Sequence, residues 1–132
     1  EDRAAFKIFL LDGGLLGAMS RLKASTIVDG NIIFTEFKGA LTEQYVMQQP
    51  VLKYEPCYFA KAKSTQEIDF LIEDEEDHVI PLEVKAETNV KAKSLRQFVL
   101  ENNPALAYRI SMNDYQVDSW LVNLPLYAVN TL

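Results

Sequence analysis

The amino-acid sequence predicts an α/β domain with a mixed central sheet that contains an antiparallel three-strand meander and is flanked by helices. Two stretches repeat their apolar residues at helical spacing, and several short runs rich in β-branched and aromatic residues lie around them. The chain of 132 residues is 48% hydrophobic, enough to bury one core of ordinary size but hardly two. We therefore expect one domain over residues 1–132.

Residues 1–30 are expected to form a leading strand, a short helix and a connector. The run Phe6–Leu11 is apolar except for Lys7 and predicts a strand, which the turn-forming residues Asp12, Gly13 and Gly14 stop. A short helix is expected to open at Asp12. Residues 21–30 show no clear period and end on a turn dipeptide, which is typical of a connector.

A catalytic-type core is expected over residues 31–111, and its first element is a long helix from Asn31 to Gln49. Asn31 is a good N-cap, Pro50 prevents continuation, and the apolar residues between them recur approximately on one helical face. Glu43 falls at the edge of this face. Its carboxylate is therefore expected to point inward.

Further strands and a second helix follow. Strands are predicted over residues 57–62, 67–73 and 79–86, and the short polar connections between them favour an antiparallel meander. A second helix is expected to open at Ser94, which forms a capping box with Gln97, and to end at Pro104. Strands over 107–111 and 119–122 come next, the latter ending before Pro125. The closing segment 112–132 is expected to finish in a turn or short helix.

The second and third strands of the meander alternate charged and apolar residues, so each presents one charged and one apolar face. A three-residue loop between them brings the two apolar faces together, whereas a two-residue loop would mix charged and apolar residues on both faces. In the first register Asp69 lies opposite Glu83, and Glu67 lies opposite Lys85. The Cβ atoms of Asp69 and Glu83 are then expected about 5 Å apart.

Two carboxylates this close are unfavourable unless a cation or a proton lies between them. Magnesium suits this position because it binds carboxylate oxygens, while water and substrate phosphate complete its octahedron. Glu43 can complete the set of metal ligands beside Asp69 and Glu83, and Lys85 can position an attacking water or offset charge that develops at phosphorus. Glu43, Asp69, Glu83 and Lys85 therefore predict metal-assisted phosphodiester hydrolysis.

An ordinary half-exposed antiparallel hairpin shows the same alternation, with Glu67 and Lys85 as a cross-strand ion pair. The basic cluster of Lys91, Lys93 and Arg96 is a candidate for phosphate contacts, and it equally fits a solvated surface. The formal net charge of −6 disfavours tight, unaided binding to nucleic acid. The residue pattern by itself leaves both interpretations open.

Other features bound the class of protein. No apolar run approaches the roughly 20 residues that span a bilayer, so we expect no membrane partner. The single cysteine, Cys57, can form no internal disulfide, and we expect a cytoplasmic location. No G-x-x-x-x-G-K-[ST] segment occurs, so no nucleotide site is expected in this fragment. Because the chain begins at Glu1 without a signal segment, we interpret it as a piece of a longer protein.

The order of these elements resembles the core of the PD-(D/E)XK nuclease superfamily, a restriction-endonuclease-like fold, with Glu83-Val84-Lys85 as its most recognisable motif. The sequence around this motif is similar to the uncharacterised C-terminal domain of prokaryotic AAA-type ATPases, and this resemblance covers nearly the whole chain. The segments that carry it are residues 9–16, 39–46, 67–70, 81–85, 93–95 and 109–111.

The resemblance implies an ATPase module, N-terminal to this domain, as its partner. It also implies that Glu43 is the helical acidic residue, Asp69 the metal-binding aspartate, Glu83 and Lys85 the Glu-x-Lys pair, and Glu67 an accessory acid. Two functions follow. One is hydrolysis of DNA with Mg²⁺, for which Mn²⁺ can substitute. The alternative is a non-catalytic scaffold that docks on or regulates the ATPase module or another protein.

These two functions predict different surfaces. A nuclease requires Glu43, Asp69 and Glu83 to converge on one accessible pocket beside the basic cluster. A docking scaffold exposes an apolar patch, and its acidic pocket can be closed.

Overall fold

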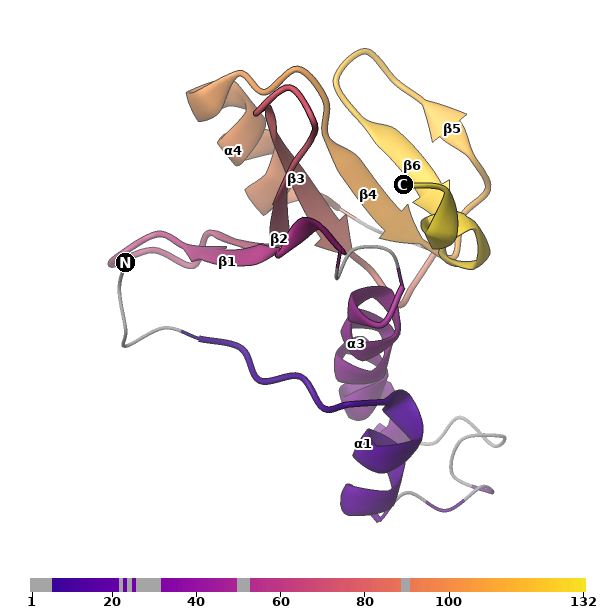
Figure 1. The fold of residues 1–132 in the computed structure, drawn as a ribbon. Helices are drawn as coiled ribbons and strands as arrows, with labels where there is room; N and C mark the ends of the chain where they lie inside the picture. The colour runs from indigo at the N-terminus through magenta and orange to yellow at the C-terminus, as the bar shows by residue number, and fades with distance from the viewer. Residues whose placement is uncertain (1–5, 22, 24, 26–31, 50–52, 89–90) are drawn as a thin grey trace.

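The computed structural model describes residues 6–21, 23, 25, 32–49, 53–88 and 91–132 of the chain. Its centre is a six-stranded mixed sheet with the strand order β1-β2-β3-β4-β6-β5 (Figure 1). The strands are β1 (Cys57–Ala60), β2 (Glu67–Glu73), β3 (Val79–Val84), β4 (Tyr108–Ser111), β5 (Gln116–Val117) and β6 (Val122–Pro125). Helices flank this sheet, so the predicted mixed α/β class is confirmed.

The sheet changes from antiparallel to parallel at β3, the strand that carries Glu83. Strands β1, β2 and β3 form the predicted antiparallel meander. Between β3 and β4 the chain passes through α4 (Lys93–Asn102), and these two strands are parallel, as a crossover connection requires. Strands β4 and β6 are also parallel, and β5 lies antiparallel to β6 at the edge.

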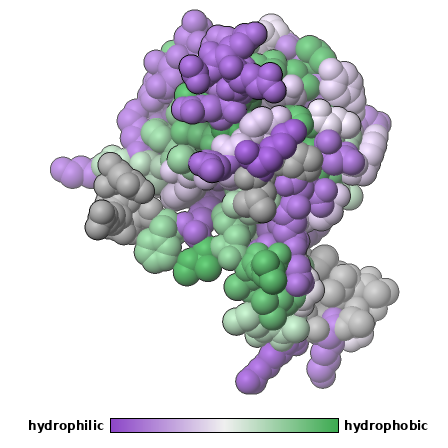
Figure 2. Space-filling view, in the orientation of Figure 1, coloured by the Kyte–Doolittle hydropathy of each residue, from purple (hydrophilic) through white to green (hydrophobic). Residues whose placement is uncertain are grey.

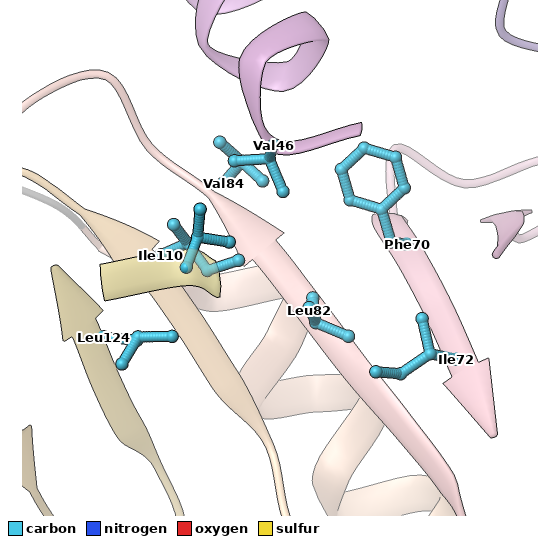
Figure 3. Packing of buried hydrophobic residues seen from close by; sticks show 8 residues of the cluster. Val46, Phe70, Ile72, Leu82, Val84, Ile110 and Leu124 are labelled. Carbon is cyan, nitrogen blue, oxygen red and sulfur yellow. The ribbon is translucent and has the colours of Figure 1, made fainter. Parts of the chain in front are cut away.

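The core consists of two apolar clusters, one for each face of the sheet, because alternate residues of a strand point to opposite faces. The larger cluster joins Val46 of α3 (Ile32–Met47) and Val129 of the 3₁₀ helix η2 (Leu126–Thr131) to apolar residues of the strands (Figure 3). The smaller cluster joins Leu95 and Phe98 of α4 to Ile68 and to residues just before β4 and β6. Helices therefore cover both faces of the sheet.

The predicted register of β2 and β3 is confirmed along their ladder, in which Phe70–Glu73 pair with Val79–Leu82. Between Ile68 and Leu71, however, the pairing of β2 with β1 shifts by one residue. As a result, Ile68 packs in the cluster under α4 and not on the face that Phe70 shares with Leu82. The predicted pairing of Asp69 with Glu83 lies beyond the end of this ladder.

The predicted strand over residues 6–11 is wrong: this segment is extended but is not part of the sheet. It leads instead to α3, whose Gln44 side chain accepts a hydrogen bond from Leu10 N and donates one to Leu10 O, both at 2.9 Å. Gln48, one turn further along, bonds Gly13 N at 3.0 Å and Leu11 O at 3.1 Å. Side-chain amides of a helix thus replace the partner strand.

The short helix α1 (Gly13–Met19) follows, and the predicted role of Asp12 is confirmed, because its Oδ1 accepts a hydrogen bond from Leu15 N at 2.7 Å. Helix α1 packs against α3, and the two project away from the sheet (Figure 1). The long predicted helix corresponds to α3. Its predicted N-cap, Asn31, and most of the predicted connector lie outside the described residues.

Three predictions concern elements in the C-terminal part of the chain; two of them need correction and one is confirmed. Helix α4 has Ala92 as its N-cap without a side-chain hydrogen bond, so the predicted capping box of Ser94 is wrong. The strand predicted over 119–122 is displaced to β6, where Pro125 ends the strand and needs no ladder N–H. The predicted short closing helix is confirmed as η2.

None of the described helices combines the length and the apolar composition needed to cross a membrane.

Candidate functional site

Two carboxylates from different elements meet at the amino group of Lys7. The Nζ atom lies 2.8 Å from Glu43 Oε2 and 2.7 Å from Asp69 Oδ1. Helix α3 supplies Glu43 from its inward side, as predicted, and β2 supplies Asp69. The Lys7 ammonium also lies 5.0 Å from the centre of the Tyr58 ring, so carboxylates and an aromatic face surround it.

The extended backbone of the leading segment explains why Lys7 points inward. Successive residues of an extended chain point to opposite sides. Phe9 packs against Phe70 with ring centres 5.6 Å apart, whereas Phe6 and Ile8 are exposed. Phe9 therefore anchors the side of the segment that faces the sheet, and Lys7, two residues earlier, lies on that same side.

Asp69 lies where the ladder between β2 and β3 ends. Its Oδ2 accepts a hydrogen bond from Val84 N at 2.8 Å, which satisfies a backbone donor beyond the last ladder pair. Its Oδ1 is bound to Lys7, and the residue is buried. The shifted pairing of β2 with β1 allows the Asp69 side chain to accept this hydrogen bond from Val84 N.

Glu83 and Lys85 form a second, neighbouring pair. Lys85 Nζ lies 2.9 Å from Glu83 Oε1, while Glu83 Oε2 is buried and has no hydrogen-bond partner among the described residues. Burial raises the pKa of Glu83 above its ordinary value, and the Asp69 charge raises it further, although Lys85 and Arg109 act in the opposite direction. The negative charge of Glu83 is thus only partly compensated.

Arg109 lies beside Glu83 because the two residues are partners in the parallel ladder of β3 and β4. Its Nε donates to Asn123 Oδ1 at 2.8 Å, and Ser111 Oγ donates to the same oxygen at 2.7 Å. The Asn123 Nδ2 atom donates to the backbone carbonyls of residues 113 and 114. The buried Asn123 therefore holds Arg109 in place next to Glu83.

Glu67 does not pair with Lys85, so the predicted cross-strand pair is wrong. Glu67 pairs with Ala60 of β1, and its Oε2 accepts a hydrogen bond from Tyr58 Oη at 2.8 Å. This hydrogen bond raises the pKa of Tyr58. Glu67 lies at the margin of the cluster, where its charge still acts on Glu43.

The ionisation of Glu43 depends on Lys7. Burial raises the pKa of Glu43, and the charges of Asp69 and Glu67 raise it further, while Lys7 lowers it. Burial by itself would lower the pKa of Lys7, but its hydrogen bonds and ion pairs with Asp69 and Glu43 outweigh burial and raise that pKa above 10.5. Lys7 is therefore protonated at neutral pH and is the counter-ion of the two carboxylates.

The predicted basic cluster forms no ion pair with these carboxylates among the described residues. Lys91, Lys93 and Arg96 are exposed at and just before the start of α4, the helix that covers the face opposite α3. Their role in phosphate contacts stays a prediction.

The predicted metal ligands are divided between the two lysines: Glu43 and Asp69 bind Lys7, and Glu83 binds Lys85. Within the part of the chain that the structure describes, no three His, Cys, Asp or Glu side chains form a ready metal site. Carboxylate oxygens, including the unpaired Glu83 Oε2, suit Mg²⁺ chemically. The residues fit such an ion only after Lys7 leaves its position between Glu43 and Asp69.

Sequence reasoning missed the roles of Lys7, Arg109 and Asn123. One signal for Lys7 was available, because it is the single charge within the apolar run Phe6–Leu11. No comparable local signal identifies Asn123, whose role depends on the parallel pairing of β4 with β6.

A comparison with protein families matches residues 38–128, more than half of the chain, to a family described as a Domain of unknown function (DUF4143). The matched range contains all the site residues described above except Lys7, which lies before it. Searches of curated proteins and of solved structures found no match.

Proposed function

This chain belongs to the DUF4143 family, and we propose that it is a nuclease-like scaffold that docks on an AAA-type ATPase module of the same longer protein. One observation carries this proposal: lysines of the chain itself neutralise the carboxylates that a nuclease would use for metal. DUF4143 domains are common in proteins associated with AAA-type ATPases. This association favours an ATPase module as the partner.

An exposed apolar face supports docking. We call it the apolar arm; it consists of Phe6, Ile8, Leu11, Leu15 and Met19, on the leading segment and α1. These side chains are between 43% and 88% exposed, and hydrophobic residues gather over this part of the molecule (Figure 2). Exposed apolar patches of this kind mark interaction surfaces in water-soluble domains.

The net charge also favours a protein partner over nucleic acid. At −6 the chain repels phosphates, and binding that does not depend on sequence rests on neutralising phosphates with Lys and Arg. An apolar contact with another protein needs no such neutralisation, because it gains free energy from the area removed from water.

The docking proposal is tested by titrating a separately produced ATPase module into the domain by calorimetry. The variant Phe6→Ser/Ile8→Ser is expected to bind at least about ten-fold more weakly, which corresponds to about 1.4 kcal/mol. Leu100→Ser on α4 is the matched control, because Leu100 and Ile8 are both 77% exposed. No binding by the wild-type domain, or equal affinity in the double variant, would overturn the proposal.

A second candidate function is Mg²⁺-dependent hydrolysis of phosphodiesters. It is favoured by the unpaired Glu83 Oε2, which lies next to the Lys85 pair and within electrostatic reach of Asp69. Buried polar groups that lack a partner are concentrated at functional sites. In this reading Asp69 and Glu83 bind the metal, Glu43 supports them, and Lys85 positions the attacking water.

Hydrolysis is tested by incubating the wild-type chain with Mg²⁺ or Mn²⁺ and single-stranded, duplex or branched DNA. Asp69→Asn removes the central carboxylate, and Asp114→Asn, at an exposed loop position, is the control. Cleavage that is lost only in Asp69→Asn would establish a nuclease. Because Lys7 occupies the position between Glu43 and Asp69, absence of cleavage of all three substrates by both the wild-type chain and Lys7→Gln would reject this candidate.

A further inference from the structure

We infer that residues 6–11 form a latch over the acidic cluster, in which the Lys7 ammonium takes the place of a divalent cation and excludes one until the segment moves. This inference concerns regulation of the carboxylate site and holds whether or not the apolar arm binds an ATPase module. It rests on the contacts of Lys7, on the way the segment is attached, and on what remains beneath it.

The contacts of Lys7 exclude a second cation. Magnesium binds carboxylate oxygens at about 2.1 Å. The Lys7 Nζ atom lies 2.8 Å from Glu43 Oε2 and 2.7 Å from Asp69 Oδ1, so it already fills the space between these two oxygens. The other Asp69 oxygen is bound to Val84 N. An ion can therefore bridge Glu43 and Asp69 only after the ammonium withdraws.

The attachment of the segment permits such withdrawal. Besides the ion pairs of Lys7, the segment is held by the packing of Phe9 on Phe70 and by the amide hydrogen bonds of Gln44 and Gln48. It belongs to no strand ladder of the described sheet, and α1, which follows it, buries no residue. The segment can therefore leave without opening the sheet, and Phe9 is the residue that it would withdraw from the larger apolar cluster.

The groups beneath the latch would attract a cation once it opened. Glu43 and Asp69 would lose their shared counter-ion, and the Asp69 charge, which raises the pKa of Glu43, would then act on Glu43 without the opposing effect of Lys7. The unpaired, buried Glu83 Oε2 is an independent sign of an unmet need for a positive partner in the same region. Two or three carboxylates together with water are a donor set that Mg²⁺ and Mn²⁺ prefer.

The test measures Mn²⁺ binding to the whole chain by electron paramagnetic resonance. Lys7→Gln keeps a hydrogen-bond donor but removes the charge, and it is expected to bind Mn²⁺ at least about ten-fold more tightly than wild type. Adding Asp69→Asn to this variant should abolish the gain. The control Lys38→Gln makes the same change in net charge at an ion pair with the exposed Glu87. Equal Mn²⁺ affinity in Lys7→Gln and Lys38→Gln would overturn the latch.

A second readout guards against loss of folding in Lys7→Gln. A ligand that binds only the folded state raises the melting temperature. We expect millimolar Mn²⁺ to raise the melting temperature of Lys7→Gln more than that of wild type or Lys38→Gln, and an equal or smaller rise would contradict the latch. Because no ATPase module is used, failure of this test is distinct from failure of the docking proposal.

Discussion

Glu83 is a buried carboxylate with one oxygen bound to Lys85 and the other without a partner among the described residues. Leaving a buried acceptor unsatisfied costs about 1–3 kcal/mol. Because burial raises the pKa of Glu83, its proton binds more tightly in the folded chain than in the unfolded chain. The contribution of Glu83 to stability therefore improves as the pH falls from neutral through its raised pKa towards 4.5.

A neutral isostere should remove the cost of burying a charge, which is larger than that of a neutral polar group. We expect Glu83→Gln to raise the free energy of unfolding by about 1 kcal/mol at pH 7, and we expect the gain to shrink towards pH 4.5, where Glu83 of the wild type is increasingly protonated. Urea denaturation at several pH values measures both effects. The exposed Glu73→Gln is the control. A Glu83→Gln chain that is less stable than wild type at pH 7 would contradict the expectation.

Lys7 neutralises a different pair of carboxylates from the pair that the sequence predicts to share a cation. The sequence predicts that two close carboxylates require a cation between them, and it names Asp69 and Glu83 as that pair. In the structure the carboxylates that share a cation are Glu43 and Asp69, and the cation is the Lys7 ammonium. The electrostatic rule is the same, but the partners come from three separate elements.

At the scale of elements, the leading segment and α3 form a unit in which side chains of the helix make the backbone hydrogen bonds that a neighbouring strand would otherwise make. Gln44 and Gln48 are four residues apart and therefore lie on the same side of α3. Their amides bond the backbone of residues 10, 11 and 13 in succession. Gln44 is 2% exposed, so both of its hydrogen bonds are shielded from water.

Removing Gln44 should loosen the segment without unfolding the sheet. Gln44→Ala leaves the Leu10 N–H and C=O without partners, and we expect stability to fall by about 1–3 kcal/mol. Hydrogen–deuterium exchange should show lost protection at Leu10 and unchanged protection in β2 and β3. Gln97→Ala, an exposed change on α4, is the control. Equal loss of protection in β2 and β3 would mean that the segment is not a separate unit.

The end of β2 is the second element that determines the site. Residues Phe70–Glu73 follow the regular ladder with β3, but the pairing with β1 shifts between Ile68 and Leu71. Ile68 consequently joins the cluster under α4, and Asp69 uses its carboxylate to bond Val84 N. Asp69 therefore lies beyond the last pair of the β2–β3 ladder and does not form the predicted cross-strand pair with Glu83.

At the scale of the whole molecule, the crossover through α4 places β3 next to β4 and thereby sets Arg109 beside Glu83. The antiparallel half of the sheet supplies Asp69 and Glu67, and the parallel half supplies Arg109 and Asn123. Helices α1 and α3 project away from this sheet (Figure 1), and α3 carries Glu43. The candidate site therefore lies where all three parts of the molecule meet.

Much of this fold was predictable because local patterns carry the information. Alternation of apolar and charged residues identified β2 and β3 and their register, since a slip of one residue would expose the apolar face of each strand. Helical spacing identified α3 and the inward position of Glu43, and turn chemistry identified the start of α1 at Asp12. These features depend on neighbours in sequence or on one adjacent strand.

The sequence by itself determined the mixed α/β class, the meander, and the residue types that gather at the site. Only the tertiary structure decided which charges meet. Lys7 lies 36 residues from Glu43 and 62 from Asp69, and a run of apolar residues around a lysine does not reveal whether its neighbour is a strand or a helix. Ion pairs between distant residues depend on how the elements pack in three dimensions, and local periodicity contains no record of that packing.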